Sequence, residues 1–181
     1  MTPATRLRRT LGAAAAALVL PAAAMAQDPV ALGKYLVDTS GCHDCHTPWH
    51  IGPNGPEPDM SRALSGHPQD IAIAAPGDLP APWIGAMTDT NTAWTGPWGV
   101  SFAANLTPDP DTGIWREMSE EQFMQALRTG RHLGQGRPIL PPMPWLPYGQ
   151  KTDDDLKAIY AYFQSITPIS NKVPDPLPPA Q

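Results

Sequence analysis

Two cysteines and two histidines stand within five residues, in the order Cys42-His43-Asp44-Cys45-His46, and the sequence has no further cysteine. Cys-x-x-Cys-His is the attachment signature of c-type haem. In that chemistry each thiol adds to a vinyl group of the porphyrin, and the imidazole of the next residue binds the iron as its proximal ligand. The motif therefore predicts one covalently attached haem c, held by Cys42 and Cys45 and ligated by His46.

The same two cysteines allow three other interpretations. A redox-active pair would begin a helix within a thioredoxin-like strand–helix pattern, but no strand alternation surrounds Leu36 or Ile51. A zinc site would need four ligands, which His50 and His67 could complete at an unusual spacing. A disulfide across two intervening residues would close a small, strained ring. Haem attachment is the interpretation that the histidine directly after Cys45 favours.

A haem iron with a proximal histidine is commonly completed by a methionine sulfur, which raises the reduction potential. Met143 lies in the sequence Pro141-Pro142-Met143-Pro144-Trp145, where the fixed dihedral angles of proline stiffen the loop. A stiff loop loses little conformational entropy when it ligates a metal. The pattern predicts Met143 as the sixth ligand.

Other side chains are alternatives for the sixth position. Met118 precedes a helix start and Met124 lies within that helix, so both are expected to pack in the core. Met60, Met87 and, as a bis-histidine alternative, His67 stay open. An iron without a sixth protein ligand would imply ligand or peroxide chemistry. The alternative function is therefore a haem enzyme, or a subunit of a catalytic complex, that acts on a small substrate at an open or displaceable sixth position.

The first 26 residues have the anatomy of a secretory leader. A basic start with three arginines is followed by an alanine- and leucine-rich run over residues 11–20 and by the small-x-small pattern Ala24-Met25-Ala26. The sequence predicts cleavage before Gln27 and export to the periplasm as a soluble protein. No apolar run reaches about 18 residues, so no membrane span is expected once the leader is removed.

Composition limits the size of the fold and its partners. A length of 181 residues suits one domain, and 24 prolines with 15 glycines indicate short helices joined by long loops. Without the three arginines of the leader, nine basic residues face 17 acidic ones, a net charge of −8. No basic stripe with interleaved aromatic residues is present, so nucleic acid is not an expected partner.

Three segments have helical patterns. Residues 30–37 lead directly into the haem motif, residues 119–129 follow a capping-box start at Ser119, and a third helix opens at Thr152 with acidic residues at the favourable end of its dipole. Gly130 ends the second helix. These elements could hold the haem without any sheet. The expected fold class is therefore all-α, with three or more short helices around one covalently attached haem.

A long insertion rich in proline and tryptophan separates the haem motif from the later helices. Residues 47–98 contain nine prolines and four tryptophans, and we expect a loop that covers one haem edge, with a short helix near residues 61–64. After residue 169 the proline-rich tail is expected to be extended and frayed. The predicted organisation is a leader over residues 1–26, a haem domain over residues 27–170 and a tail over residues 171–181.

Several short motifs follow one another in an order typical of a known family. They are Gly33-Lys34-Tyr35-Leu36 before the haem motif, Asn105-Leu106-Thr107-Pro108-Asp109 with Asp111-Thr112-Gly113-Ile114, Ser119-Glu120-Glu121-Gln122-Phe123, Ala126-Leu127-Arg128-Thr129-Gly130, Pro142-Met143-Pro144-Trp145 and Ala158-Ile159-Tyr160-Ala161-Tyr162. Over most of residues 29–169 the chain resembles the class I cytochrome c domains. More narrowly, it is similar to the cytochrome c subunits that accompany periplasmic alcohol, gluconate and related dehydrogenases.

The resemblance implies an all-α cytochrome c domain with Cys42 and Cys45 as thioether anchors and with His46 and Met143 as axial ligands. It also implies a periplasmic electron carrier, not itself an enzyme, that passes single electrons from a dehydrogenase to a downstream acceptor. Proteins of this kind often carry three haem domains and a membrane anchor, whereas this sequence has one haem motif. The expected protein is thus a single-haem version, and no candidate catalytic base stands out near Met143.

Overall fold

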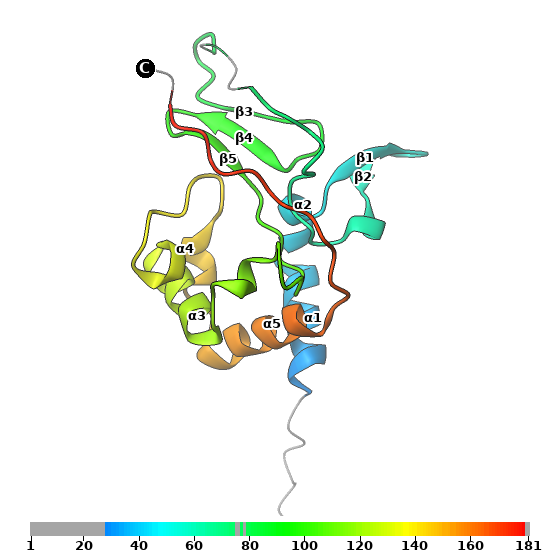
Figure 1. Ribbon diagram of the computed structural model, residues 1–181, viewed down its shortest axis with the longest axis vertical. Helices are drawn as coiled ribbons and strands as arrows, with labels where there is room; N and C mark the ends of the chain where they lie inside the picture. Colours follow the sequence, from blue (N-terminus) through cyan, green and yellow to red (C-terminus); the bar gives the residue numbers. More distant parts are fainter. Residues whose placement is uncertain (1–27, 75–76, 78, 180–181) are drawn as a thin grey trace, which may run out of the picture.

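The computed structural model describes residues 28–74, 77 and 79–179. Within these residues most helices gather at one end of the molecule and the strands at the other, and α2 lies between them (Figure 1). The predicted leader over residues 1–26 lies outside the described residues, so its cleavage stays a prediction. The elements in chain order are α1 (Pro29–Thr39), α2 (Cys42–His46), β1 (Trp49–Gly52), β2 (Gly55–Pro58), η1 (Met60–Arg62), β3 (Ala86–Met87), β4 (Ala93–Gly96), β5 (Gly99–Phe102), η2 (Ile114–Arg116), α3 (Glu120–Thr129), η3 (His132–Gly134), α4 (Trp145–Tyr148) and α5 (Asp153–Ser165).

The described part of the chain contains five α-helices and five strands, so the expectation of an all-α fold is wrong. β1 pairs with β2, and β3, β4 and β5 form a second antiparallel sheet. All five strands fall within or directly after the segment 47–98, for which the sequence predicts a loop. The fold is therefore a mixed one, in which the expected helices are joined by an insertion that folds into two small sheets.

Tight turns, rather than alternating apolar side chains, define these hairpins. Gly52 lies opposite Gly55, and Gly96 lies opposite Gly99, so β1 and β2, like β4 and β5, are joined by a two-residue connection. Gly55 and Gly99 have φ angles of 115° and 92°, a region that favours glycine. Ile51 in β1 is 77% exposed, so this hairpin does not bury its largest aliphatic side chain.

The helical frame begins with α1, which packs along α5. The Asp28 side chain accepts a hydrogen bond from the N–H of Val30 at 3.0 Å and thereby caps α1. Gly33 allows the close approach of the two helices, because a Cβ there would lie 1.9 Å from the carbonyl oxygen of Ala158. None of the described helices combines the length and the apolar character that crossing a bilayer demands.

The start and end of α3 follow the sequence prediction. Ser119 and Gln122 form a capping box, in which each side chain accepts a hydrogen bond from the backbone N–H of the other residue. Met118, directly before the cap, is buried in the core. Gly130 follows the helix with a φ of 67°, the left-handed conformation that commonly ends helices.

An aromatic cluster forms the centre of the core beside α3 and α5. The ring of Trp115 lies 5.5 Å from that of Phe123, 5.3 Å from that of Tyr160 and 5.4 Å from that of Phe163. The indole N–H of Trp115 donates to the carbonyl of Leu106 at 2.8 Å, so its polar atom is satisfied. This cluster packs α3 and α5 against each other through Phe123, Tyr160 and Phe163.

The described part of the C-terminal tail is extended but not frayed. It runs from the end of α5 back along the molecule to the sheet (Figure 1). The side-chain amide of buried Asn171 donates to the carbonyl oxygens of Ser65 and His67, at 2.7 Å and 2.9 Å. Further along, Leu177 exchanges two backbone hydrogen bonds with Val100 of β5. The tail thus ties the insertion to the helical body.

His67 is a fully buried histidine in the insertion. Its Nε2 donates to the carbonyl oxygen of Ile71 at 3.0 Å, and its Nδ1 accepts from the hydroxyl of Thr92 at 2.9 Å. The hydroxyl of Thr90 continues the chain of bonds to Thr92 at 2.8 Å. Burial lowers the pKa of His67 below its usual value, so the native protein holds this ring in its neutral form.

Acidification should therefore destabilise the protein through His67. Its pKa is lower in the native state than in the unfolded one, so the unfolded chain takes up the proton first, and the free energy of unfolding falls as the pH drops below about 6.5. Urea unfolding of the protein at about pH 7.5 and about pH 5.5 measures the loss. The loss should be smaller in His67→Gln, which cannot be protonated. An equal loss in both proteins contradicts the prediction.

Candidate functional site

The two cysteines lie one helical turn apart on α2, which also carries His46. Gly41 precedes this helix with a φ of 75°, a left-handed conformation that redirects the chain from α1 into α2. Residues three apart share one face of a helix, so the thiols of Cys42 and Cys45 lie on the same side. Both thiols are free and half-buried. This donor set fits the two thioether bonds and the proximal nitrogen that haem c requires.

The thiols of this pair are not activated. Burial raises the pKa of Cys42 to about 11 and also raises the pKa of Cys45. Both groups are therefore protonated at neutral pH, unlike the thiolate of a redox-active Cys-x-x-Cys pair. The element before α2 is the helix α1 and not a strand. The thioredoxin-like interpretation thus lacks both its electrostatics and its structural context.

His46 is oriented by a backbone carbonyl. Its Nδ1 lies 2.8 Å from the carbonyl oxygen of Ala104. Because a carbonyl can only accept, Nδ1 carries the proton and the lone pair of Nε2 is left for a metal. Burial lowers the pKa of His46 below its usual value, which keeps the ring neutral. A neutral imidazole with a bare Nε2 is the form that ligates iron.

Gly66 brings the insertion against this histidine. Its N–H donates to the carbonyl oxygen of His46 at 2.8 Å. A Cβ on Gly66 would lie 2.5 Å from the carbonyl oxygen of Ala103 and 2.6 Å from the carbonyl carbon of Ala104. With a φ of 79°, the residue also needs a conformation that favours glycine. Gly66 therefore lets one short segment contact both the haem motif and the carbonyl that orients His46.

Met143 lies in the loop between η3 and α4, half-buried against the hydrophobic core. Its N–H donates to the carbonyl of Leu140 at 3.3 Å, and its carbonyl accepts from the N–H of Trp145 at 2.9 Å. Cys42 borders the same core cluster. The structure thus places Met143 and the haem motif around one core, and the ligation itself stays a prediction.

Tyr148, on α4, connects the methionine loop (residues 135–144, between η3 and α4) to the start of the haem motif. Its hydroxyl donates to the carbonyl oxygen of Ser40 at 2.5 Å, one residue before Gly41. Burial raises the pKa of Tyr148 to about 12, with smaller contributions from Cys42 and Cys45, so the phenol stays a hydrogen-bond donor at neutral pH. The segment that follows Met143 is thereby fastened to the chain segment that presents the cysteines.

Gly130 clamps the other side of this loop, because a Cβ there would lie 2.4 Å from the indole ring of Trp145. Gly130→Ala should lower the free energy of unfolding by about 1–2 kcal/mol through left-handed backbone strain, which corresponds to a fall of roughly 2–8 °C in Tm. The added methyl group should also displace Trp145. We expect weaker methionine ligation, visible in the haem spectrum. Gly55→Ala is the matched control, since its φ is also positive but nothing lies within 4 Å of its Cβ site. Equal spectra in the two variants contradict the clamp.

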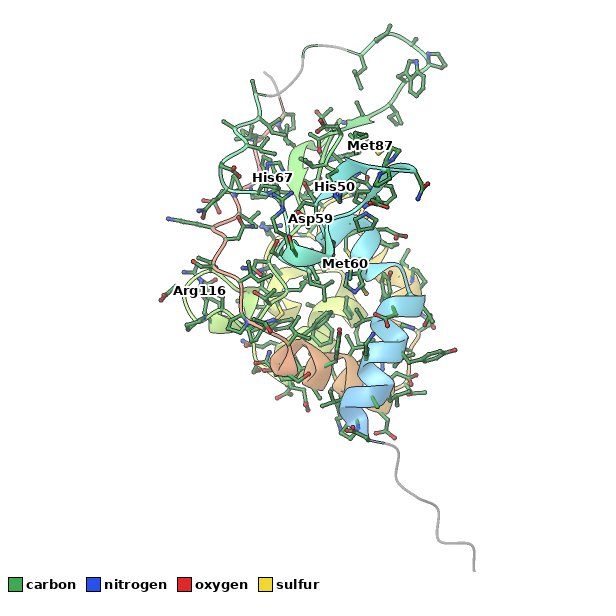
Figure 2. All side chains as sticks on the ribbon, turned by 90° about the vertical axis from the view of Figure 1, so that its right-hand side faces the viewer. His50, Asp59, Met60, His67, Met87 and Arg116 are labelled. Atoms are coloured by element: carbon green, nitrogen blue, oxygen red, sulfur yellow. The ribbon has the colours of Figure 1, made fainter. Side chains whose placement is uncertain are left out.

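The other methionines lie in different surroundings. Met118 is buried in the core and Met124 is packed against it, which confirms their predicted packing role. Met60 and Met87 are 60% and 67% exposed. Met87 lies toward the sheet end of the molecule and Met60 nearer to the helices (Figure 2). Met87 pairs with Trp94 in the ladder of β3 and β4, whereas Met143 packs against the hydrophobic core, and the assignment of the sixth ligand to Met143 stays a prediction.

The side chains of the alternative zinc site do not come together. Both ring nitrogens of His67 are engaged, by Thr92 and by Ile71. His50 lies on an exposed strand, 3.7 Å from a carboxylate oxygen of Glu57. In the part of the chain that the structure describes, no group of three or more histidine, cysteine or acidic side chains could hold a metal ion. The engagement of His67 also argues against the bis-histidine alternative.

Sequence reasoning missed the residues that support the candidate ligands. Ala104, Gly66 and Tyr148 act through a backbone carbonyl, a missing side chain and a phenol distant in sequence. The alanine leaves no signal in its residue type, and one glycine among 15 is not distinctive. The tyrosine lies five residues after Met143 in a stretch that the sequence marks only by its prolines.

Comparison with known proteins gives similarity to dehydrogenase subunits, whereas no family model matches the chain. The chain is 31% identical over 160 residues to "Alcohol dehydrogenase (quinone), cytochrome c subunit" of Gluconobacter oxydans, a match that covers 84% of this chain and 26% of the relative. It is 37% identical over 75 residues to "Gluconate 2-dehydrogenase cytochrome c subunit" of Pantoea cypripedii, covering 41% of this chain and 17% of the relative. A third match, 37% identical over 73 residues, is "Fructose dehydrogenase cytochrome subunit" of Gluconobacter japonicus, covering 40% of this chain and 15% of the relative.

These matches confirm the resemblance predicted from the sequence, since several relatives are cytochrome c subunits of dehydrogenases and some match over most of the chain. The matched part is about a quarter or less of the length of the relatives described above. The similarity therefore concerns one portion of larger proteins.

Proposed function

We propose that this chain, a relative of dehydrogenase cytochrome c subunits, is an exported cytochrome c with a single covalent haem. In this proposal it takes single electrons from a dehydrogenase in the periplasm and passes them to a downstream acceptor. The dehydrogenase oxidises the substrate, and this chain is an electron-transfer subunit or carrier rather than an enzyme. The haem, when bound, supplies a one-electron couple at iron.

The observation that carries the proposal is the hydrogen bond from His46 to Ala104. It fixes the tautomer that leaves Nε2 bare, on the same helix as two free thiols that lie on one face. Neither a structural disulfide nor a redox-active dithiol requires a neighbouring histidine whose Nε2 lone pair is kept available for a metal. Similarity to cytochrome c subunits supports the same conclusion from an independent direction.

Four residues of the chain would bind the haem, each in a different role. Cys42 and Cys45 would anchor the porphyrin, His46 would bind the proximal side of the iron and Met143 the distal side. Apolar cover by the core that borders Cys42 and Met143 would exclude water and lower the local dielectric constant. Both effects favour a raised reduction potential, together with the methionine sulfur.

Production of the whole chain in a host equipped for cytochrome maturation tests the proposal. We expect a coloured periplasmic protein that keeps its haem stain after denaturing electrophoresis, at one haem per chain. The ferrous protein should bind carbon monoxide slowly or not at all, and a dehydrogenase with its substrate should reduce it without a mediator. The same chain from a host without the maturation proteins serves as the colourless control.

Two results would count against the proposal in different ways. A colourless product from the equipped host contradicts haem attachment. A haem protein whose ferrous form binds carbon monoxide readily contradicts the closed electron carrier and supports a haem enzyme with an open sixth position.

A further inference from the structure

A buried serine of the three-stranded sheet reaches the methionine loop. Ser101, on β5, is 6% exposed, and its hydroxyl donates to the carbonyl oxygen of Pro141 at 2.5 Å. A second carbonyl, that of Trp94, lies 3.4 Å from the same hydroxyl. Because a serine hydroxyl has one hydrogen, the shorter contact with Pro141 takes it. This bond joins β5 to a residue two positions before Met143.

The serine is itself oriented by a tryptophan. The indole N–H of Trp98 donates to the hydroxyl oxygen of Ser101 at 3.3 Å. Since an indole N–H can only donate, the serine oxygen must accept this bond and is left to donate its own hydrogen toward Pro141. The two bonds therefore form a chain with one direction, from Trp98 through Ser101 to the methionine loop.

The methionine loop needs support of this kind. Pro141, Pro142 and Pro144 have no backbone N–H, so the stretch around Met143 has few donors with which to hold itself in place. Its own backbone bonds run from Met143 to Leu140 and from the residue after Pro144 to Met143. The Ser101 hydroxyl supplies a tie from a different part of the fold, at the point where the loop enters the turn before Met143.

We propose that Ser101 is a positioning residue that sets how firmly Met143 ligates the haem iron, with Trp98 orienting its hydroxyl. The inference rests on the proposed function, because it takes Met143 as the distal ligand. It gives the sheet of the insertion a role in the haem site itself. Trp98 and Pro142 also line one apolar groove of about 620 Å³, so the same two segments meet at the surface as well as through the buried serine.

Ser101→Ala in the haem-loaded protein tests the proposal. Loss of the hydroxyl should leave the haem attached, lower the temperature at which the methionine-to-iron absorption band disappears, and lower the reduction potential. Carbon monoxide should bind the ferrous form roughly three- to tenfold faster, the size expected for one buried hydrogen bond. Trp98→Phe keeps an aromatic ring, although a smaller one, but loses the indole N–H, so it should shift the same three quantities by less.

Ser65→Ala is the matched control. Ser65 is 2% exposed, and its hydroxyl donates to the carbonyl of Arg62 at 2.8 Å, so the change removes the same kind of bond elsewhere in the insertion. It should lower the Tm without moving the band, the potential or the carbon monoxide rate. Ser101→Thr, which keeps a hydroxyl, should behave as the wild type does.

The outcomes separate this inference from the function on which it rests. If Ser101→Ala and Ser65→Ala have equal bands, potentials and carbon monoxide rates, while Met143→Ala loses the band, Ser101 does not position the ligand and the inference is overturned. If Met143→Ala keeps the band, the ligand assignment fails and the inference fails with it. If Ser101→Ala does not fold, the band and potential of Trp98→Phe decide, and wild-type values in that variant overturn the inference.

Discussion

Replacing Met143 by alanine should leave the haem attached but remove the methionine-to-iron absorption band, lower the reduction potential and open the iron to carbon monoxide. The two thiols that would form the thioether bonds and the imidazole that would bind the iron lie on α2 and do not depend on this side chain. A thioether sulfur stabilises ferrous over ferric iron, so its loss lowers the potential. Axial ligands set haem potentials over roughly 0.8 V, and we expect a fall on the order of 0.1 V. Visible spectra, redox titration and carbon monoxide binding measure the three effects.

Other methionines supply the controls for this variant. Met124→Ala removes a side chain packed against the same core, so it should lower the Tm and keep the band. Met60→Ala and Met87→Ala change exposed side chains and should alter neither quantity. A band that survives Met143→Ala and disappears in Met60→Ala or Met87→Ala moves the distal ligand into the insertion. Carbon monoxide binding by the wild type at the rate of Met143→Ala shows that no methionine closes the site.

The helices could be predicted from the sequence because local signals define them. Ser119 with Gln122, and Thr152 with Asp155, form reciprocal capping boxes at the starts of α3 and α5. Gly130 ends α3 in the left-handed conformation. Each of these signals acts within four residues, so it is readable without knowledge of the tertiary fold.

The sheets could not be predicted in the same way. The strands have two to four residues, and β2 consists of two prolines, a glycine and a glutamate. Such a strand has no apolar alternation, and proline usually argues against a strand. The turns at Gly55 and Gly99, together with the backbone bonds of Leu177 to β5, fix these hairpins, and the last of these joins residues far apart in sequence.

The candidate site shows the same division between local and distant residues. The sequence singles out Cys42, Cys45 and His46 because the chemistry of haem attachment would dictate such a spacing. The carbonyl that orients His46 belongs to Ala104, and the hydroxyl that reaches Pro141 belongs to Ser101. An alanine that acts through its backbone carries no chemical signature, and a serine in a strand is not distinctive. Hydrogen bonds of this kind, which hold a candidate ligand or its loop in place, can be identified only in the folded structure, where the distant segments come together.

Removal of both thiols, in the double variant Cys42→Ala and Cys45→Ala, should abolish the haem stain after denaturing electrophoresis. The chain has no other cysteine, so no thioether bond can form. Each single variant keeps one thiol on the same face of α2 and should retain a weaker stain, because one thioether holds the porphyrin with less control over its orientation. Staining intensity and the mass of the intact chain, with and without bound haem, measure the outcome.

Asp44→Ala is the control for this prediction, since Asp44 lies between the two cysteines and is exposed. The change keeps both thiols and His46, so the stain should equal that of the wild type. His46 would still present its bare Nε2 in the double variant, and some haem could bind without a covalent bond. Denaturation should release that haem, whereas the thioether-linked haem of the wild type should survive. A stain that persists in the denatured double variant would mean that haem is attached through a different residue, and the role assigned to α2 would then be wrong.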